Sequence, residues 1–348
     1  IQQRFPAFGY AGNDTADFPI WDAAEEIILV NPTRPARAKY SDKADHLFTE
    51  RRPVVKMLLK AMRCHQWLKN LLIFAPLVLA HQFTDPATPL QTLNAVLAFF
   101  AFSFAASSIY VLNDLFDLSA DQHHPRKCHR PFASGDLSIT IGALLIPILA
   151  LLSIILGMLL PPSFLWVLLV YYAITTLYSW RLKQMEVIDV LTLALLYSMR
   201  IVAGSAATGI PASSWFIIFA IFLFLSLALV KRLSELREIK DDSGAEHAYR
   251  ERGYTVGDLP LLMAFGTASG YLSVVVFTMY LNSDRVAHLY THPELLWLFC
   301  PLLLYWITRI WMLAWRGQMH DDPLAFATKD PHTYVVGALG IAIILFAI

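Results

Sequence analysis

The sequence has few charged residues and no excess of either sign. Only 16% of its 348 residues are Asp, Glu, Lys or Arg, whereas a soluble globular domain carries about 25%. The 27 basic and 27 acidic residues give a formal net charge of zero, so we expect no nucleic-acid partner. Hydrophobic residues make up 57% of the chain. This composition excludes a disordered chain, a coiled coil and an ordinary cytosolic enzyme.

Cysteine is also scarce. Cys64, Cys128 and Cys300 are scattered and form no Cys-x-x-Cys pair, which excludes a disulfide scaffold and argues against a zinc site. The chain begins with Ile rather than Met, and no signal peptide precedes its polar residues 1–62. We therefore expect a piece of a longer protein that opens on a soluble segment and a linker.

Long runs without Asp, Glu, Lys or Arg fill the rest of the chain. A membrane-spanning helix needs about 20 mostly apolar residues. The charge-free run 137–180 is long enough for two such helices, with Pro161 and Pro162 at the turn between them. The fold class that we expect is an all-α polytopic membrane protein with a short polar N-terminal segment. The pattern predicts nine spans, at roughly 68–84, 92–113, 138–159, 164–181, 187–207, 213–232, 260–281, 295–315 and 332–348.

The charges of the loops predict an orientation. The N-terminal segment and the loops after the second, fourth, sixth and eighth spans hold nearly all the Lys and Arg from Arg51 onward. The loops on the opposite side hold only Arg285. Because short cytoplasmic loops carry such an excess, we expect the N-terminus in the cytoplasm and the protein in a bacterial cytoplasmic membrane.

Acidic residues gather where the second span ends. Asn113, Asp117 and Asp121 are spaced i, i+4, i+8 and would share one face of a helix, with Asp114 beside them. Carboxylates on one face repel each other unless a cation lies between them, and Mg²⁺ prefers oxygen ligands together with substrate phosphates. The spacing predicts a magnesium site, and the alternative is a solvated charged loop at the membrane face.

Basic residues follow this acidic row at once. Arg126, Lys127 and Arg130 come within the next few residues, and their side chains are of the kind that binds phosphate. Acids that hold a metal, followed by bases that hold phosphate, indicate a diphosphate site.

These motifs together resemble a known family. Asn113-Asp-x-x-Asp117-x-x-x-Asp121, with Lys127, Arg130-Pro131 and Ser134-Gly135 after it, resembles the first Asp-rich motif of the UbiA superfamily of intramembrane prenyltransferases. Further stretches resemble the start of its helix one, the end of its helix four and its helix five: Gln66-Trp67-Leu68-Lys69-Asn70, Tyr178-Ser179-Trp180-Arg181-Leu182-Lys183, and Asp189 with Arg200 to Gly204. The resemblance covers roughly 55–348. It implies a Mg²⁺-dependent transferase of nine helices around a central cavity, with its polar motifs at the cytoplasmic mouth.

The second acidic motif that the resemblance implies is replaced. After the sixth span, where members of the superfamily carry Asp-x-x-x-Asp, this chain has Lys231-x-x-x-Glu235, and Asp241-Asp242 lies further out. The Lys231-Arg232-x-x-Glu235-Leu stretch resembles the decaprenyl-phosphate phosphoribosyltransferase-like branch. Enzymes of that branch move phosphoribose from phosphoribosyl pyrophosphate (PRPP) to a polyprenyl phosphate.

A count of anionic groups favours the same branch. A prenyl diphosphate brings one anionic group, whereas PRPP brings two and the lipid phosphate a third. Lys231 and Arg232 supply extra cations for them, although both could be ordinary anchors at the membrane face. We therefore expect phosphoribose transfer from PRPP to a polyprenyl phosphate, with release of diphosphate. The alternative is transfer of a polyprenyl group from its diphosphate to an aromatic acceptor such as 4-hydroxybenzoate. A transporter is disfavoured because the polar residues cluster at one face.

Individual residues receive the following expected roles. Metal binding is expected of Asn113, Asp114, Asp117 and Asp121, and catalytic roles are expected of Asp117, Asp121, Lys231 and Arg200. Substrate binding is expected of Lys69, Asn70, Lys127, Arg130, Tyr178, Lys183, Asp189, Arg232 and Glu235.

Some of these residues are also expected to contact each other. Arg200 lies inside a span, where a charge is costly and therefore functional by default. Asp189 precedes it by about three helical turns, so the two either face one cavity or form a structural ion pair. Glu235 lies one turn after Lys231 and is expected to orient it.

Two further patterns concern packing. Gly266 and Gly270 form a Gly-x-x-x-Gly, which predicts a close helix contact inside the protein. Asp321-Asp322-Pro323 is interpreted as the start of a helix, with the alternative that its carboxylates reach the active site.

The polar N-terminal segment carries a resemblance of its own. Gly12-Asn13-Asp14-Thr15-Ala16-Asp17, followed by Trp21 and Val30-Asn31-Pro32, resembles the last motif of haloacid-dehalogenase-type phosphatases, in which an acid helps to hold Mg²⁺. The alternative is an ordinary Asx-rich turn. The resemblance implies two domains, the tail of a fused phosphatase in residues 1–50 and the transferase in 51–348.

Overall fold

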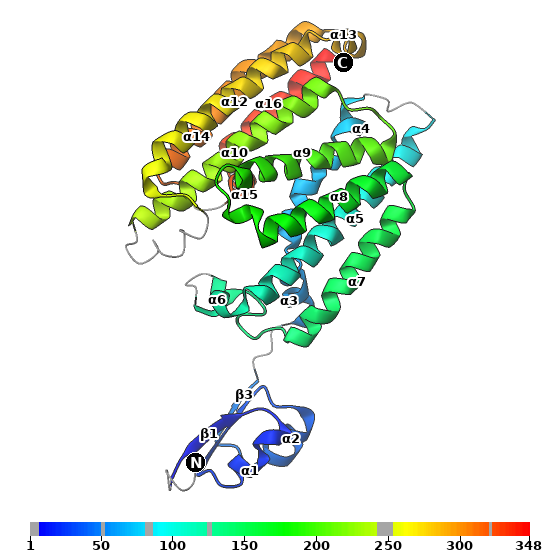
Figure 1. Cartoon of the computed structure of the whole chain (residues 1–348). Helices are drawn as coiled ribbons and strands as arrows, with labels where there is room; N and C mark the ends of the chain where they lie inside the picture. The colour runs from blue at the N-terminus through cyan, green and yellow to red at the C-terminus, as the bar shows by residue number, and fades with distance from the viewer. Residues whose placement is uncertain (1–6, 50–52, 81–85, 124–126, 242–252, 320–321) are drawn as a thin grey trace. The chain divides into compact units, whose positions relative to one another are not determined.

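The computed structural model describes residues 7–49, 53–80, 86–123, 127–241, 253–319 and 322–348 (Figure 1). The chain divides into two compact units, of which the first comprises Ile1–Ala61 and Leu118–Ser138 and the second Met62–Asp117 and Ile139–Ile348. Residues 51–61 and 118–138 thus group with the N-terminal segment, whereas we expected a division after residue 50.

The first unit contains a small parallel sheet. Its strands β1 (Gly9–Gly12), β2 (Glu26–Val30) and β3 (His46–Phe48) pair in the order β1-β2-β3. In the register, Tyr10 pairs with Ile27 and Leu29 pairs with Leu47. Because parallel strands need crossover connections, η1 (Thr15–Asp17) and α1 (Phe18–Trp21) join β1 to β2, and α2 (Arg34–Tyr40) joins β2 to β3. The expectation of an all-α chain is therefore wrong for the N-terminal residues.

Alternating burial explains this sheet. Ile27 and Leu29 of β2 are buried in a core with Trp21, Ala36 and Tyr40, while Glu26 and Val30 are exposed. This period of two along the Glu-Ile-Ile-Leu-Val run is typical of a strand with one covered face. The other elements of this unit are α3 (Val54–Ala61), α6 (Leu118–His123) and η3 (Lys127–His129). The Lys60 ammonium donates to the carbonyl oxygen of His129 at 2.8 Å.

Every regular element among the described residues of the second unit is a helix. Its elements are η2 (Cys64–Phe74), α4 (Ala75–Leu79), α5 (Thr88–Phe116), α7 (Ile139–Met158), α8 (Pro162–Trp180), η4 (Leu182–Gln184), α9 (Ile188–Thr208), α10 (Ser214–Asp241), η6 (Val256–Asp258), α12 (Leu259–Leu281), α13 (Asp284–Leu289), η7 (Pro293–Leu298), α14 (Phe299–Trp315), α15 (Pro323–Ala327) and α16 (Pro331–Ala347).

Seven of the nine expected spans appear as helices long and apolar enough to cross a membrane. They correspond to α5, α7, α8, α9, α10, η6 with α12, and η7 with α14. The expected last span is α16, which has 17 residues. The expected first span is divided between η2 and α4, because a run of 3₁₀ geometry ends at Phe74 and a new helix begins at Ala75 with Pro76 in its first turn. The count of nine is therefore not confirmed.

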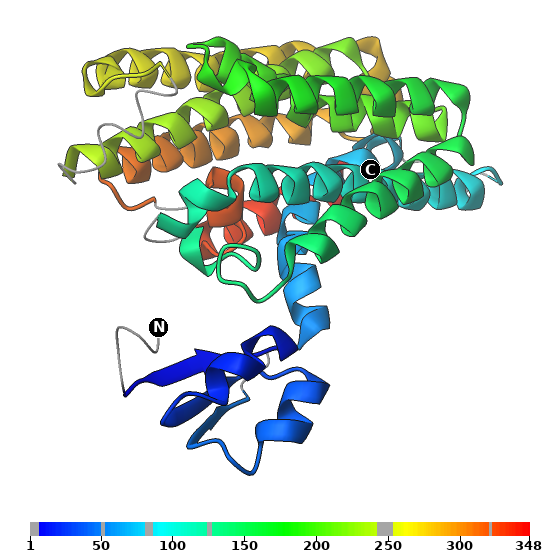
Figure 2. The same ribbon diagram turned by 60° about the horizontal axis from the view of Figure 1, so that its bottom comes forward.

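Burial separates inner from outer helices in the second unit. In α5 and α9, 61% of the apolar window is buried, compared with 17% in α7 and 22% in α8. Figures 1 and 2 show α10, α12 and α14 side by side, and all three helices contact one another. Most of the expected site residues of this unit lie on the inner helices α5, α9 and α10.

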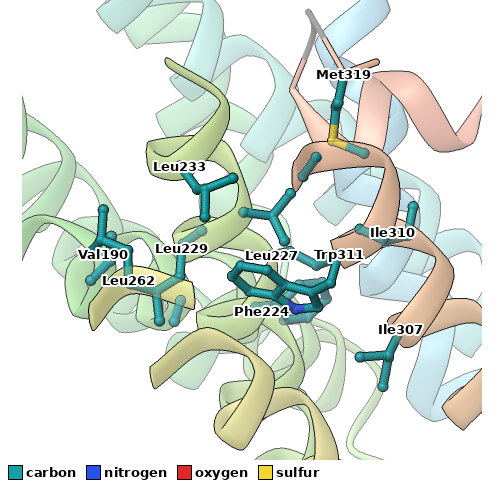
Figure 3. Packing of buried hydrophobic residues seen from close by; sticks show 14 of the residues in the cluster. Val190, Phe224, Leu227, Leu229, Leu233, Leu262, Ile307, Ile310, Trp311 and Met319 are labelled. Carbon is teal, nitrogen blue, oxygen red and sulfur yellow. The ribbon is translucent and has the colours of Figure 1, made fainter. Parts of the chain in front are cut away.

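The core between α10, α12 and α14 is centred on one indole ring. Trp311 of α14 lies among Phe224, Leu227 and Leu229 of α10 and donates from its indole nitrogen to Ser226 at 3.0 Å (Figure 3). Only a glycine admits that ring, since a Cβ atom at Gly266 would lie 2.1 Å from it.

The expected internal Gly-x-x-x-Gly contact is confirmed. Gly266 meets Trp311 of α14 and Leu229 of α10, and Gly270 meets Ile307 of α14 and Ser226 of α10. Both glycines of α12 therefore face helices of the same chain.

Gly204 makes the closest such approach and generates the first testable prediction. A Cβ atom at this position of α9 would lie 2.0 Å from the carbonyl oxygen of Ile73 in η2, a backbone atom that cannot turn aside. We expect Gly204→Ala to destabilise the protein by about 1–3 kcal/mol and to lower its thermal unfolding temperature in detergent. Gly337→Ala is the matched control, because nothing lies within 4 Å of that position in α16. Equal unfolding temperatures for the two variants would contradict the packing described.

Candidate active site

The acidic row at the end of α5 does not continue along one helix. Asn113 lies in the last turn of α5, and Asp117 is its C-terminal cap, with its backbone N–H donating to the carbonyl of Asn113 at 2.9 Å. A new helix, α6, begins at Leu118. Asn113 and Asp117 keep the expected i, i+4 relation, whereas Asp121 lies in α6 and in the other compact unit.

Two of the expected metal ligands contact arginine. The carboxylate of Asp114, which is 3% exposed, accepts from Arg63 at 2.5 Å, and the guanidinium of Arg63 lies 5.0 Å from the ring centre of Tyr110. Within the first unit, Asp121 is equally buried and accepts from Arg130 at 2.5 Å. Arginine is always charged, so each of these carboxylates lies against a permanent positive charge.

The other residues of the row have different surroundings. The side-chain amide of Asn113 donates to the hydroxyl of Ser179 at 3.0 Å. Lys127, expected to bind phosphate, lies half-buried in η3. Among the described residues, no three His, Cys, Asp or Glu side chains are arranged to hold a metal ion. The oxygen donors of the row suit Mg²⁺ chemically, but Asp114 and Asp121 are held by arginine.

A second polar cluster lies between η2, α9 and α10. The ammonium of Lys69 lies 5.2 Å from the ring centre of Tyr197, and the guanidinium of Arg200 lies 5.4 Å from it. Lys231 of α10 and Asp322 line a pocket with Tyr197. One carboxylate oxygen of Asp322 is 3.0 Å from the Lys69 ammonium and 3.6 Å from that of Lys231. The cluster brings three cations and one acid together around one aromatic ring.

Arg200 is held within this cluster by neutral partners. Its side chain is buried, with Nε donating to Asn70 at 2.8 Å and Nη1 to the carbonyl oxygen of Leu196 at 2.5 Å. Asn70 is buried as well and donates to Ser103 at 2.9 Å. Both ends of the Asn70 amide are therefore used inside the protein. Asn70 positions Arg200. Of the two alternatives for Arg200 and Asp189, the structural ion pair between them does not form.

The surroundings of η2 are electropositive. Partial burial, with the nearby charges of Arg63, Lys69 and Lys329, lowers the pKa of His65 at the start of η2. A histidine with a lowered pKa stays neutral at pH 7. The positive charge near η2 therefore comes from its Lys and Arg neighbours.

Asp189 is paired with Arg232 instead. Both side chains are fully buried, and Nε of Arg232 donates to Asp189 at 2.5 Å. The same guanidinium binds Glu235 and donates to the hydroxyl of Tyr178 at 3.2 Å. We expected Arg232 to bind phosphate, but its guanidinium is paired with acids of the same protein. We expected Glu235 to orient Lys231, but it binds Arg232. The network ties the end of α8 to the start of α9 and to α10.

Tyr254 completes this buried network from the segment before η6. Its hydroxyl donates to Asp189 at 2.6 Å and accepts from the backbone N–H of Val187 at 2.8 Å. Burial, and then the hydrogen bond to Asp189, raise the pKa of Tyr254 well above its usual value. The phenol therefore remains a proton donor at any physiological pH.

The remaining expected residues lie outside both clusters. Lys183 is half-buried in η4, directly after α8. Asp242 and Arg126 lie outside the described residues, as does the side chain of Asp241.

Comparisons with known proteins identify the family of the chain. Residues 71–329 match the model of the UbiA prenyltransferase family. The chain belongs to the UbiA prenyltransferase family. An uncharacterized protein, y4nM, of Sinorhizobium fredii is 37% identical over 97% of this chain, which spans 66% of that relative's length. A decaprenyl-phosphate phosphoribosyltransferase of Mycolicibacterium smegmatis is 30% identical, over 86% of this chain and 98% of its own length.

Solved structures of the family share the fold. A UbiA homologue from Archaeoglobus fulgidus, solved with GPP and Mg²⁺ bound, has a TM-score of 0.61 at 20% identity, over 83% of this chain and 99% of its own length. The superfamily resemblance is thus confirmed, and the protein is an integral membrane transferase of the UbiA family. The phosphatase-like tail in residues 1–50 stays a prediction. There, the backbone N–H groups of Asn13 and Asp14 donate to Asp17 at 2.7 and 2.9 Å.

Three residues of the candidate site gave no clear signal in the sequence. Asp322 precedes a proline, a pattern that marks a helix start, and a position near the active site was only the alternative interpretation. Arg63 lies far from Asp114 in sequence, and Tyr197 is one of fourteen tyrosines in an aromatic-rich chain. Spacing along the sequence could have found none of their contacts.

The buried pair generates the second prediction. We expect Arg232→Met to lower the free energy of unfolding by about 3–5 kcal/mol, because it leaves Asp189 buried without its counter-ion. Thermal unfolding of the detergent-purified protein would measure the loss. Asp189→Leu combined with Arg232→Met removes both charges, so we expect the double variant to be more stable than the single one. A double variant that is less stable than Arg232→Met would refute the pairing.

Proposed function

We propose that this protein transfers phosphoribose from PRPP to a polyprenyl phosphate in the membrane, with release of diphosphate. The observation that carries the proposal is the cluster of Lys69, Arg200 and Lys231 around Tyr197. Lys231 stands where the superfamily resemblance implies an acid. The name of the M. smegmatis relative, a decaprenyl-phosphate phosphoribosyltransferase, supports the same reading.

The charge of the cluster favours one of the two candidate donors. A prenyl diphosphate needs one anion site, and metal ions neutralise much of its charge. PRPP adds a separate 5-phosphate, and the lipid acceptor adds another phosphate. Lys231 lines the pocket with Tyr197, and the ammonium of Lys69 lies 3.0 Å from Asp322, which lines the same pocket. Ammonium groups bind phosphate as point charges. The cluster suits the donor and acceptor that bring more phosphates.

Each group has a defined part in the proposed reaction. An oxygen of the lipid phosphate attacks the anomeric carbon of PRPP, the bond from that carbon to the diphosphate oxygen breaks, and the diphosphate leaves with the electron pair. A phosphate oxygen is already anionic at neutral pH, so the site needs no strong general base. Lys69 and Lys231 hold phosphate groups. Arg200 is buried behind Tyr197 and stabilises negative charge through its field rather than by contact.

Magnesium belongs to the proposal as a cofactor. Bound Mg²⁺ would act as a Lewis acid on the departing diphosphate. Asn113 and Asp117, four residues apart at the end of α5, offer an amide and a carboxylate, and Asp114 lies beside them. Asp121 remains a ligand proposed from sequence spacing alone. The A. fulgidus homologue with GPP and Mg²⁺ bound supports a divalent metal in this family.

We also propose that the site faces the cytoplasm. The Lys/Arg-rich loops of the second unit include those after α8 and α14, and such loops face the cytoplasm. PRPP is a charged, water-soluble donor, so a cytoplasmic mouth would give it access while the lipid phosphate reaches the site from the membrane.

The third prediction tests the donor. Purified protein with Mg²⁺ should convert labelled PRPP and a polyprenyl phosphate into lipid-soluble label. It should give no labelled product from a labelled prenyl diphosphate and 4-hydroxybenzoate, because its cations match the phosphates of PRPP. Product extraction and scintillation counting measure both reactions. Label in the second reaction alone would assign the alternative, aromatic prenyl transfer.

The fourth prediction concerns the metal. Asp117→Ala should lower Mg²⁺-dependent kcat by about a hundredfold or more, as expected when a group that stabilises the leaving charge is removed. Its unfolding temperature should be close to that of the wild type, since Asp117 lies at a helix end. Asp284→Ala, which removes an exposed carboxylate from α13, is the control and should keep full activity. Full activity of Asp117→Ala would reject the metal assignment.

A further inference from the structure

The carboxylate of Asp322 lies between two lysines that the proposed function assigns to phosphate. A single oxygen, Oδ2, is 3.0 Å from the ammonium of Lys69 and 3.6 Å from that of Lys231. The side chain of Asp322 is 14% exposed, and that of Lys69 is 13% exposed. The three residues come from η2, from α10 and from the residue directly before α15, so the tertiary fold alone brings them together.

An anionic oxygen held between two ammonium groups is the arrangement that a substrate phosphate would adopt there. Phosphate and carboxylate both bind ammonium through charge-assisted hydrogen bonds of similar length. Asp322 also lines the same pocket as Lys231 and Tyr197. Its carboxylate therefore takes up the hydrogen bond of Lys69 and the nearby charge of Lys231, which a phosphate oxygen needs.

Two other roles for Asp322 fit less well. A metal ligand is disfavoured because a carboxylate already neutralised by two ammonium groups has little affinity left for a cation, and the described residues hold no group of three acids, His or Cys around one point. A helix start requires only the backbone carbonyl of Asp322, which accepts from the N–H of Phe326 at 2.8 Å. The side chain faces the lysines.

We infer that Asp322 is a resident counter-ion that a phosphate of the substrate displaces. In the free protein it neutralises one of the two lysines and keeps them near each other without bound anion. When a phosphate enters, it replaces the carboxylate as the partner of the two ammonium groups. The nearby carboxylate then repels the bound phosphate. Asp322 thus weakens anion binding and favours release of the diphosphate product. The inference rests on the proposed function in one respect, that Lys69 and Lys231 bind phosphate.

Pyrophosphate binding provides the test. We expect Asp322→Asn to bind inorganic pyrophosphate about two- to fivefold more tightly than the wild type, the size of effect that a partly exposed charge pair gives. Isothermal titration calorimetry on the detergent-purified full chain, with Mg²⁺ present, measures the dissociation constant. The difference should shrink only modestly as salt is raised from low to high concentration, because salt screens largely buried charges less than exposed ones. In turnover, Asp322→Asn should lower KM for the donor.

Matched variants separate this inference from other causes. Asp322→Glu keeps the charge and should bind pyrophosphate nearly as the wild type does. Asp284→Asn makes the same change of net charge at α13 and should leave binding unchanged. Binding by Asp322→Asn that equals the wild type, or is weaker, would overturn the inference, as would the absence of pyrophosphate binding in all variants. If Asp322→Asn is unstable, Asp322→Ser removes the same charge and must give the same tightening.

The result of the pyrophosphate measurement does not depend on which donor the protein uses. Both candidate donors release diphosphate, so the pyrophosphate result stands even if PRPP proves not to be a substrate. Failure of the PRPP reaction with tighter pyrophosphate binding by Asp322→Asn would reject the proposed function alone. A working PRPP reaction without tighter pyrophosphate binding by Asp322→Asn would reject only the role given to Asp322.

Discussion

A charge buried among membrane-spanning helices costs several kcal/mol unless a partner neutralises it or hydrogen bonds satisfy it. That constraint explains the polar interior of the second unit. Arg232 is paired with Asp189, Asp114 with Arg63, and Arg200 with the amide of Asn70 and a backbone carbonyl. These contacts join η2, α5, α9 and α10, so the same interactions that satisfy the buried charges fix the helices around the site.

Among the described residues, cations outnumber acids around Tyr197, and the chemistry is proposed there. Around Tyr197, Lys69 and Lys231 share the carboxylate of Asp322, and Arg200 adds a third cation. A surplus of positive charge in a partly exposed pocket favours anionic ligands. The buried Arg232 network lies one residue beyond Lys231 on α10 and holds that helix in place. The fully buried Arg232 thus holds the helix in place, while its neighbour Lys231 is partly exposed in the site.

Several features could be read from the sequence because they depend on local composition. Seven spans follow from apolar length, and the family follows from short motifs such as Asn113 to Asp121. The sheet of residues 9–48 was missed because the polar composition there hid three short strands. The helix break at Asp117 was missed as well, since a regular i, i+4, i+8 spacing suggests a continuous helix even where the backbone turns.

The sequence by itself determined that the chain crosses a membrane, that it belongs among UbiA-like transferases and that acids and bases gather after the second span. These are properties of consecutive residues. Only the tertiary structure decided which charge meets which: Asp189 binds Arg232 rather than Arg200, Glu235 binds Arg232 rather than Lys231, and Asp322 joins Lys69. Ion pairs form between side chains a few ångströms apart in space, and helix packing brings together residues as distant as 69 and 322, so spacing along the chain cannot specify them.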